Sequence, residues 1–136
     1  MRPFPSARIL VVDDHELNRK LLERLLGIEG YDVSAADCVA SAEEAIAEIN
    51  PVLIVLDLQL PDGDGVDLAR KLKTELGADC PAIVACTAGV MNGEEERALR
   101  GGCDAYVPKP IDARSFADLI ASLLPEGSHP TSPLAA

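Results

Sequence analysis

Short apolar runs alternate with amphipathic stretches along the chain, and each kind of segment occurs five times. The apolar runs predict strands and span residues 8–13, 32–36, 52–57, 82–87 and 105–107. The first, third and fourth runs are almost continuously apolar, which is typical of strands covered on both faces in a parallel sheet. The second and fifth runs are shorter and more polar, so we expect them at the edges of the sheet.

Four of the stretches between these runs carry an apolar stripe at helical spacing. The stripes are Leu17, Leu21, Leu22, Leu25 and Leu26; Ala42, Ala45, Ile46 and Ile49; Val66, Ala69, Leu72 and Leu76; and Phe116, Leu119, Ile120, Leu123 and Leu124. Gly27 and Gly30 predict the end of the first helix. Ser41, three residues before Glu44, predicts an N-cap for the second helix. Each of the four helices should bury its stripe.

The remaining helical stretch, residues 89–102, differs from the other four. Glycines flank and interrupt it, and Ala98 and Leu99 are nearly all that it can bury. By helix propensity and by buried area, it should be the helix that is held least firmly. A weakly held helix suits a switch element, although an exposed helix without that role shows the same pattern.

Strands that alternate with helices predict an α/β protein with right-handed crossovers and a doubly wound parallel sheet. Because the first and third runs are the most apolar, they belong at the centre, and a (βα)5 flavodoxin-like fold with strand order 2-1-3-4-5 fits best. We expect this domain over residues 8–124, after an N-terminal extension of residues 1–7. The Pro- and Ser-rich tail, residues 125–136, should be disordered.

Chemically capable residues fall at the carboxyl ends of the predicted strands. Asp13 and Asp14 follow the first strand, and Asp57 ends the third. Thr87 ends the fourth strand, and Lys109 follows the fifth in the sequence VPKP. The carboxyl ends of parallel strands meet at one edge of a sheet, so these side chains should share one crevice.

This set of residues predicts phosphoryl-transfer chemistry. Three carboxylates held close together raise one another's pKa unless a cation joins them, and Mg²⁺ prefers a few carboxylates together with waters and phosphate oxygens. Lys109 can hold a phosphoryl oxygen, and the Thr87 hydroxyl can donate a hydrogen bond to it. Asp57 is the candidate nucleophile that forms an aspartyl phosphate.

Four motifs in this order, VVDD, VLDLQLPDGDG, ACTA and KP, resemble the CheY-like receiver domain of bacterial two-component response regulators. The resemblance covers residues 8–124. It implies that Asp57 accepts a phosphoryl group from a sensor histidine kinase or a histidine phosphotransfer protein. It also implies a bound Mg²⁺ or Mn²⁺, held by Asp14, by Asp57 and by the backbone carbonyl of Gln59, with Asp13 acting through a water molecule.

By the same resemblance, Thr87 and Lys109 would contact the phosphoryl group, and Thr87 and Tyr106 would act as the switch. The peptide bond before Pro110 would be cis and would aim Lys109 inward. A downstream protein would bind the face made by the fourth helix, the fifth strand and the fifth helix. The resemblance implies a monomer or a weak homodimer.

Two further positions and one longer run refine the resemblance. Gln59 and Gly89 lie two residues beyond Asp57 and Thr87, at positions that tune dephosphorylation in the family. The run GEEERALRGGCDAYVPKPI, residues 93–111, is most similar to single-domain cell-cycle regulators of the DivK type. A single-domain signalling protein of this kind is not an enzyme beyond its own phosphotransfer and dephosphorylation.

Composition narrows the partners and the compartment. The formal net charge of −11 over 136 residues argues against nucleic-acid binding, because phosphate backbones need clustered Lys and Arg. No apolar stretch reaches membrane-spanning length and the N-terminus lacks a signal-peptide cleavage site, so we expect no membrane association and a cytoplasmic protein. The four cysteines show no metal-ligand spacing, and we expect free thiols.

Several alternatives stay open from the sequence alone. Asp14 taken by itself could cap the first helix. His15 could be a metal ligand, but a hard ion prefers oxygen, and we expect His15 to begin an exposed helix. The chain could be a Mg²⁺-dependent phosphatase of the haloacid dehalogenase class, although Gln59 stands two residues after Asp57 where that class usually has an aspartate. It could also be a receiver-like binding module that works without phosphorylation.

Overall fold

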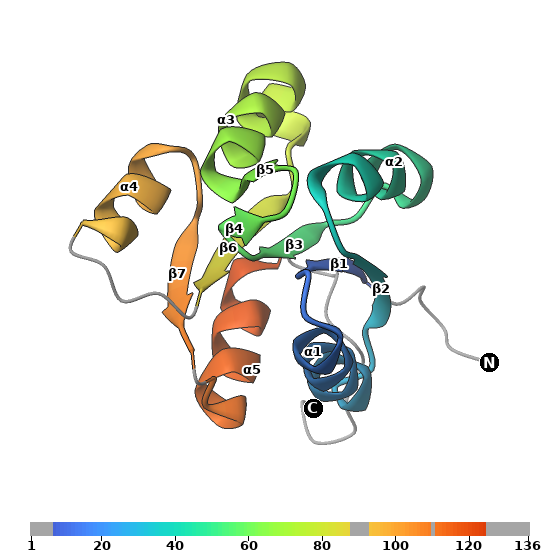
Figure 1. The fold of residues 1–136 in the computed structure, drawn as a ribbon. Coiled ribbons are helices and arrows are strands. Elements are labelled where there is room, and N and C mark those ends of the chain that lie inside the picture. Colours follow the sequence, from blue (N-terminus) through green and yellow to red (C-terminus); the bar gives the residue numbers. More distant parts are fainter. Residues whose placement is uncertain (1–6, 88–92, 110, 125–136) are drawn as a thin grey trace.

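Five parallel strands form one sheet in the computed structural model, which describes residues 7–87, 93–109 and 111–124. The strand order is β2-β1-β3-β6-β7, which is the predicted order, with β2 and β7 at the edges (Figure 1). The strands are β1 (Arg8–Val12), β2 (Asp32–Ala36), β3 (Leu53–Leu56), β6 (Ala82–Thr87) and β7 (Ala105–Pro108). The predicted α/β doubly wound fold is therefore confirmed.

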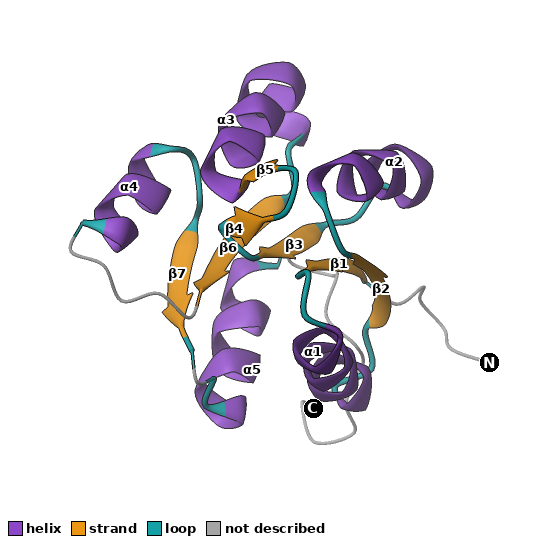
Figure 2. Ribbon diagram, viewed as in Figure 1, coloured by secondary structure: helices purple, strands orange, loops and turns teal. Residues whose placement is uncertain are grey.

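Helices cover both faces of this sheet (Figure 2). One face carries α1 (Glu16–Ile28) and α5 (Ala113–Leu123), and the other carries α2 (Val39–Ile49), α3 (Gly65–Leu76) and α4 (Glu94–Arg100). A single 3-10 turn, η1 (Gly77–Asp79), follows α3. Within the described part of the chain, no helix combines the length and the apolar character that crossing a bilayer requires.

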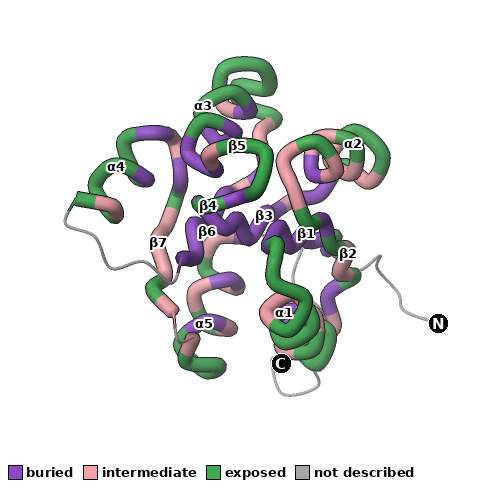
Figure 3. Tube along the Cα trace, viewed as in Figure 1, coloured by how far each residue is buried: buried purple, intermediate pink, exposed green. Residues whose placement is uncertain are grey.

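The core is divided between the two faces because consecutive strand residues point to opposite sides of a sheet. In β1, Ile9 and Val11 pack with α1 and α5, whereas Leu10 and Val12 pack with α2 and α3. All four side chains are buried, and Figure 3 shows the central strands as the most deeply buried part of the molecule. Covering both faces explains why β1 is a continuous apolar run.

A short hairpin that the sequence did not predict follows β3. Its strands β4 (Gln59–Leu60) and β5 (Gly63–Asp64) pair in antiparallel fashion, and α3 begins directly after β5. At its tip, the Asp62 carboxylate accepts hydrogen bonds from the N–H groups of Val39 (2.7 Å) and Ala40 (3.0 Å) at the start of α2. These hydrogen bonds lower the pKa of Asp62. They also tie the hairpin to α2.

One predicted helix boundary is wrong, and another is only partly confirmed. The N-cap of α2 is Cys38, and Ser41 is the third residue of the helix, where each of the two side chains accepts a hydrogen bond from the other residue's N–H group. The Ser-x-x-Glu pattern therefore placed the start of α2 three residues too late. At the end of α1, Gly27 lies inside the helix, which continues to Ile28. Gly30 follows the helix end with a φ of 94°, and its N–H donates to the Gly27 carbonyl at 3.0 Å, so this second stop signal is confirmed.

The apolar stripe of α1 is only partly buried, which contradicts the prediction. Leu22 and Leu26 are buried, but Leu17 is 81%, Leu21 48% and Ile28 73% exposed. At 3.6 residues per turn, the leucines of α1 span about half of the helix circumference, which is wider than the stripe that one contact face covers. The sheet and α5 therefore bury one side of the stripe and leave the other in solvent.

The cysteines agree with the prediction of free thiols. All four are free, and Cys86 on β6 is buried in the core beneath α1 and α5. Burial raises the pKa of the Cys86 thiol to about 12. This residue therefore fills space in the core and has little reactivity.

Candidate functional site

The sheet itself brings the two central aspartates together. Val12 of β1 is in register with Leu56 of β3, so Asp13 and Asp57 leave adjacent strands at the same level. The N–H of Asp57 donates to the Val12 carbonyl at 2.9 Å, and the N–H of Asp13 donates to the Ala36 carbonyl at 3.1 Å. Both residues therefore continue the hydrogen-bond ladder, and their positions depend on the strands rather than on a loop.

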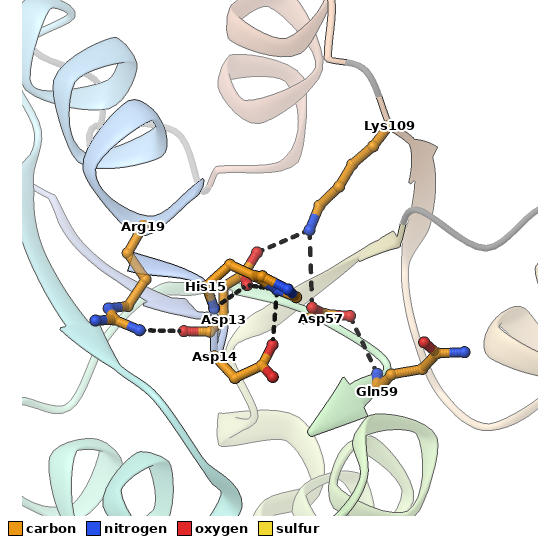
Figure 4. A network of polar contacts seen from close by, with 7 residues as sticks. All are labelled: Asp13, Asp14, His15, Arg19, Asp57, Gln59 and Lys109. Carbon is orange, nitrogen blue, oxygen red and sulfur yellow. Dashed lines mark hydrogen bonds and ion pairs between the residues drawn. The ribbon is translucent and has the colours of Figure 1, made fainter. Parts of the chain in front are cut away.

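Lys109 reaches into this pair from the other side (Figure 4). Its Nζ lies 2.8 Å from Asp13 Oδ2 and 3.7 Å from Asp57 Oδ2. The main-chain N–H of Lys109 donates to the Thr87 carbonyl at 3.0 Å, which ties the segment after β7 to β6. Burial alone would lower the pKa of the Lys109 ammonium, but the hydrogen bond to Asp13 and the attraction of Asp57 and Asp13 outweigh it, and the pKa is raised.

The Asp57 carboxylate is in an unfavourable electrostatic position. It is only 6% exposed, and burial raises its pKa. A hydrogen bond from the Gln59 N–H at 3.1 Å and the charge of Lys109 act in the opposite direction, whereas the charges of Asp13 and Asp14 raise the pKa further. The net shift is upward, so the ionised form of Asp57 would gain from an additional cation.

The cluster fits a hard divalent cation. One ligand atom from each of Asp13, Asp14, His15 and Asp57 can be chosen so that all of them lie within 4.8 Å of one another. Three of the four residues are carboxylates, the ligand type that Mg²⁺ and Mn²⁺ take in proteins. The three aspartates that the sequence predicted at a metal site therefore lie together, and His15 joins them as a member that was not predicted.

A cleft of about 400 Å³ opens above the cluster. It is lined by Asp14, His15, Asn18, Asp57, Gln59, Leu60, Pro61, Thr87 and Lys109. Thr87 is 1% exposed and sits in the wall of this cleft. Since one water molecule occupies about 30 Å³ of liquid volume, the cleft has room for an ion and a phosphoryl group together.

Among the other predicted residues, Tyr106 does not line the cleft. It lies on β7, half-buried against the core beneath α3 and α4. Burial raises the pKa of its phenol, and the nearby charges of Glu94 and Glu95 in α4 raise it further. Gly89 and Pro110 lie outside the described residues, as do the tail and most of the predicted N-terminal extension.

Sequence reasoning missed two residues of the site. Asn18 lines the cleft, and its place in the first turn of the helix that directly follows the strand-end aspartates was the available signal. Arg19 donates from Nη1 to the main-chain carbonyl of Asp13 at 2.8 Å and so fixes the junction between β1 and α1. No sequence pattern marks such a contact. His15, which was expected to lie outside the site, lines the cleft.

Comparisons with known proteins point to one family. Residues 9–121 match the model of the response regulator receiver domain. The chain is 36% identical over 116 residues to the polar-differentiation response regulator DivK of Brucella ovis, which covers 85% of this chain and 94% of that protein.

Two solved structures share the fold over most of its length. The BeF3-activated N-terminal receiver domain of Klebsiella pneumoniae RstA has a TM-score of 0.81 at 27% identity and covers 88% of this chain and 99% of that one. A signal receiver domain from Bermanella marisrubri has a TM-score of 0.80 at 32% identity, with 87% and 98% covered.

Proposed function

The chain belongs to the response regulator receiver-domain family, and from this premise we propose that it accepts a phosphoryl group on Asp57 and signals through phosphorylation-dependent protein binding. Receiver domains are signalling proteins rather than classical enzymes. The observation that carries the proposal is the position of Asp57. Its carboxylate is buried at the cleft, opposite the Lys109 ammonium and beside two further carboxylates.

The chemistry follows from these positions. An oxygen of Asp57 attacks the phosphorus of a phosphohistidine, the new O–P bond forms as the P–N bond breaks, and the electron pair of that bond leaves on the imidazole nitrogen. Lys109, 3.7 Å from Asp57, holds a phosphoryl oxygen after transfer, and the Thr87 hydroxyl donates a hydrogen bond to the same group. A divalent cation, when bound, neutralises the carboxylates and the phosphoryl oxygens.

The hydrogen bonds of Asp13 and the exposure of Asp14 support different roles for the two residues in binding the cation. Asp13 Oδ2 accepts from Lys109 at 2.8 Å, and Asp13 Oδ1 accepts from the His15 N–H at 2.9 Å. Both oxygens of Asp13 are thus already engaged, which supports a contact to Mg²⁺ or Mn²⁺ through water. Asp14, with a side chain that is 34% exposed at the rim of the cleft, would bind the ion directly together with Asp57 and the carbonyl of Gln59.

The phosphoryl donor is a histidine kinase or a histidine phosphotransfer protein, which must cover the rim of the cleft to reach Asp57. Leu17 and Leu21 are exposed on the first half of α1, the helix that begins beside the cleft, and supply an apolar surface for this partner. Replacing both with Ser should slow transfer from the protein donor about 10-fold but leave transfer from acetyl phosphate unchanged. The matched control is Ile28→Ser, at the far end of the same helix.

The output face proposed here is α4–β7–α5. Within α4, Ala98 is buried and Leu99 is 46% exposed, so a small displacement of this helix changes the surface offered to a downstream protein. Ala85 of β6 is in register with Tyr106 of β7, two residues before Thr87. A movement of Thr87 toward the phosphoryl group would therefore change the packing around Tyr106, which lies beside α4.

Labelling with acetyl phosphate tests the proposed phosphoacceptor. With Mg²⁺ present, the intact protein should gain the mass of one phosphoryl group, and either EDTA or Asp57→Asn should abolish the gain. Asp79→Asn, an exposed aspartate at the end of η1, is the control and should label like the wild type. Undiminished labelling of Asp57→Asn would contradict the assignment.

A further inference from the structure

His15 faces the carboxylates although it is a surface residue. It is the N-cap of α1, yet its side chain makes no capping hydrogen bond within the described residues. Its Nδ1 lies 3.0 Å from Asp14 Oδ1 and 3.5 Å from Asp13 Oδ1. Figure 4 shows the imidazole at the carboxylate cluster. The side chain is 70% exposed, as expected for a helix start, but its nitrogen lies at the cluster.

The main chain restricts where this imidazole can go. The N–H of His15 donates to Asp13 Oδ1 at 2.9 Å, and its carbonyl accepts from the Arg19 N–H at 3.0 Å. The Arg19 guanidinium in turn donates to the Asp13 carbonyl at 2.8 Å. These three hydrogen bonds hold the β1–α1 junction. The backbone of His15 is therefore fixed at the mouth of the cleft. A ligand on a fixed backbone loses less freedom when it binds an ion.

The spacing of the ligand atoms suits a single octahedral ion. With metal–ligand distances of about 2.1 Å, adjacent ligands of an octahedral ion lie about 3 Å apart and opposite ones about 4.2 Å apart. The 3.0 Å between His15 Nδ1 and Asp14 Oδ1 corresponds to two adjacent ligands. The four-residue cluster as a whole stays within 4.8 Å, slightly more than the separation of opposite ligands, so small side-chain movements bring one ion into contact with His15, Asp14 and Asp57.

We propose that His15 Nδ1 is a ligand of the divalent cation and makes this site favour Mn²⁺ over Mg²⁺. Imidazole binds transition ions well, whereas Mg²⁺ prefers oxygen and keeps its waters. The proposal rests on the cation site proposed above. Asp14 and Asp57 attract either ion by charge, and His15 adds affinity for one class only.

A different role for His15 would produce the same distances, because an imidazolium could simply neutralise Asp14. The two roles differ in the effect of removing the ring. A counter-ion competes with every added cation, so its removal would strengthen the binding of Mg²⁺ and Mn²⁺ alike. An imidazole ligand adds affinity for Mn²⁺ alone. Its removal therefore weakens the binding of Mn²⁺ and leaves that of Mg²⁺ nearly unchanged.

Calorimetric titration of the full chain with MgCl₂ and with MnCl₂ separates these roles. The titrations are made at pH 6, where free imidazole is largely charged and a counter-ion role would show, and at pH 8, where it carries no charge. In His15→Ala and in His15→Gln, the affinity for Mn²⁺ should fall about 10-fold, or ~1.4 kcal/mol, while the affinity for Mg²⁺ is retained and shows that the variants fold. The control is His129→Ala, which removes the other histidine of the chain and should not change the Mn²⁺/Mg²⁺ ratio.

Pulsed EPR of the Mn²⁺ complex provides a direct readout of the ligand. The wild type should show the coupling of a bound imidazole nitrogen, and His15→Ala should lack it. Equal losses for both ions, a joint gain in affinity, or no nitrogen coupling in the Mn²⁺-loaded wild type would each overturn the role of His15. Wild-type protein that binds neither ion would contradict the cation site itself, and with it this proposal.

Discussion

Asp13 and Asp57 leave two central strands and take part in the hydrogen-bond ladder of the sheet, whereas α4 lies at its edge and has Ala98 as its buried residue. The carboxylate pair is therefore held by the buried centre of the sheet. The contacts of α4 include an exposed ion pair between Arg97 and Asp64. This difference indicates that α4 can shift at low cost while the site keeps its geometry.

The largest effect is expected where the backbone packs against the site. A Cβ on Gly65, the first residue of α3, would lie 2.5 Å from the carbonyl oxygen of Asp57 and 2.8 Å from the Cα of Leu58. Neither atom belongs to a flexible side chain. Gly65→Ala should therefore lower the free energy of unfolding by about 2–3 kcal/mol, as measured by chemical denaturation, and should weaken Mg²⁺ binding.

Gly27→Ala is the matched control for this prediction. Gly27 lies inside α1, and a Cβ there meets no atom within 4 Å. Since Ala is the better helix former, this variant should be unchanged or more stable by up to about 1 kcal/mol. If the two variants lost similar amounts of unfolding free energy, the close approach of Gly65 to Asp57 would not be the reason why position 65 requires glycine.

An intermediate effect is expected from the charge of Asp57. Burial raises its pKa in the folded protein, so the folded state holds this proton more tightly than the unfolded state does. Stability is then lost as the pH rises from the unfolded value, about 3.9, through the raised folded pKa. At pH 7 in EDTA, Asp57→Asn should raise Tm by about 2–5 °C, and the gain should vanish below pH 3.9.

Adding Mg²⁺ should make the wild type more stable than Asp57→Asn, which reverses the order of stability expected in EDTA. Ligand binding stabilises the folded state by about 2.7 kcal/mol at 100 times Kd, and this gain requires the Asp57 carboxylate. Thermal melts with and without Mg²⁺ at pH 7 measure both parts of the prediction. A variant that is less stable than the wild type in EDTA would contradict the electrostatic cost assigned to Asp57.

The smallest effect on global stability is expected at α4. The side chains of Arg97 and Asp64 are 49% and 33% exposed, so breaking their ion pair with Arg97→Ala should change the free energy of unfolding by less than about 1 kcal/mol. Hydrogen exchange of the α4 amides should nevertheless accelerate, while that of β1 and β3 should not. Arg100→Ala, which removes a pair with Glu96 inside α4, is the control. Equal acceleration in β1 would contradict the independence of α4.

The strand-end residues could be predicted because a parallel sheet leaves few choices. Continuous apolar runs had to be central strands, and their carboxyl ends had to meet at one edge, which places Asp13 near Asp57. The spacing of apolar residues along a helix does not show how much of the apolar stripe the neighbouring elements cover. This is why Leu17 and Leu21 were expected to be buried and are exposed.

Contacts between distant segments account for the other differences. The β4–β5 hairpin is tied to α2 through Asp62 and the N–H groups of Val39 and Ala40, more than 20 positions away along the chain. No local pattern encodes such a contact. His15 was set aside because of its residue type, yet the junction that Arg19 closes brings its nitrogen to the carboxylates.

The phosphoryl group is expected on Asp57 and not on a neighbouring carboxylate. Borohydride reduction after treatment with acetyl phosphate and Mg²⁺ converts an aspartyl phosphate into a residue that peptide mass mapping can locate. Modification is expected at Asp57 alone. Modification at Asp13 or Asp14, or an unmodified Asp57 in labelled protein, would contradict it.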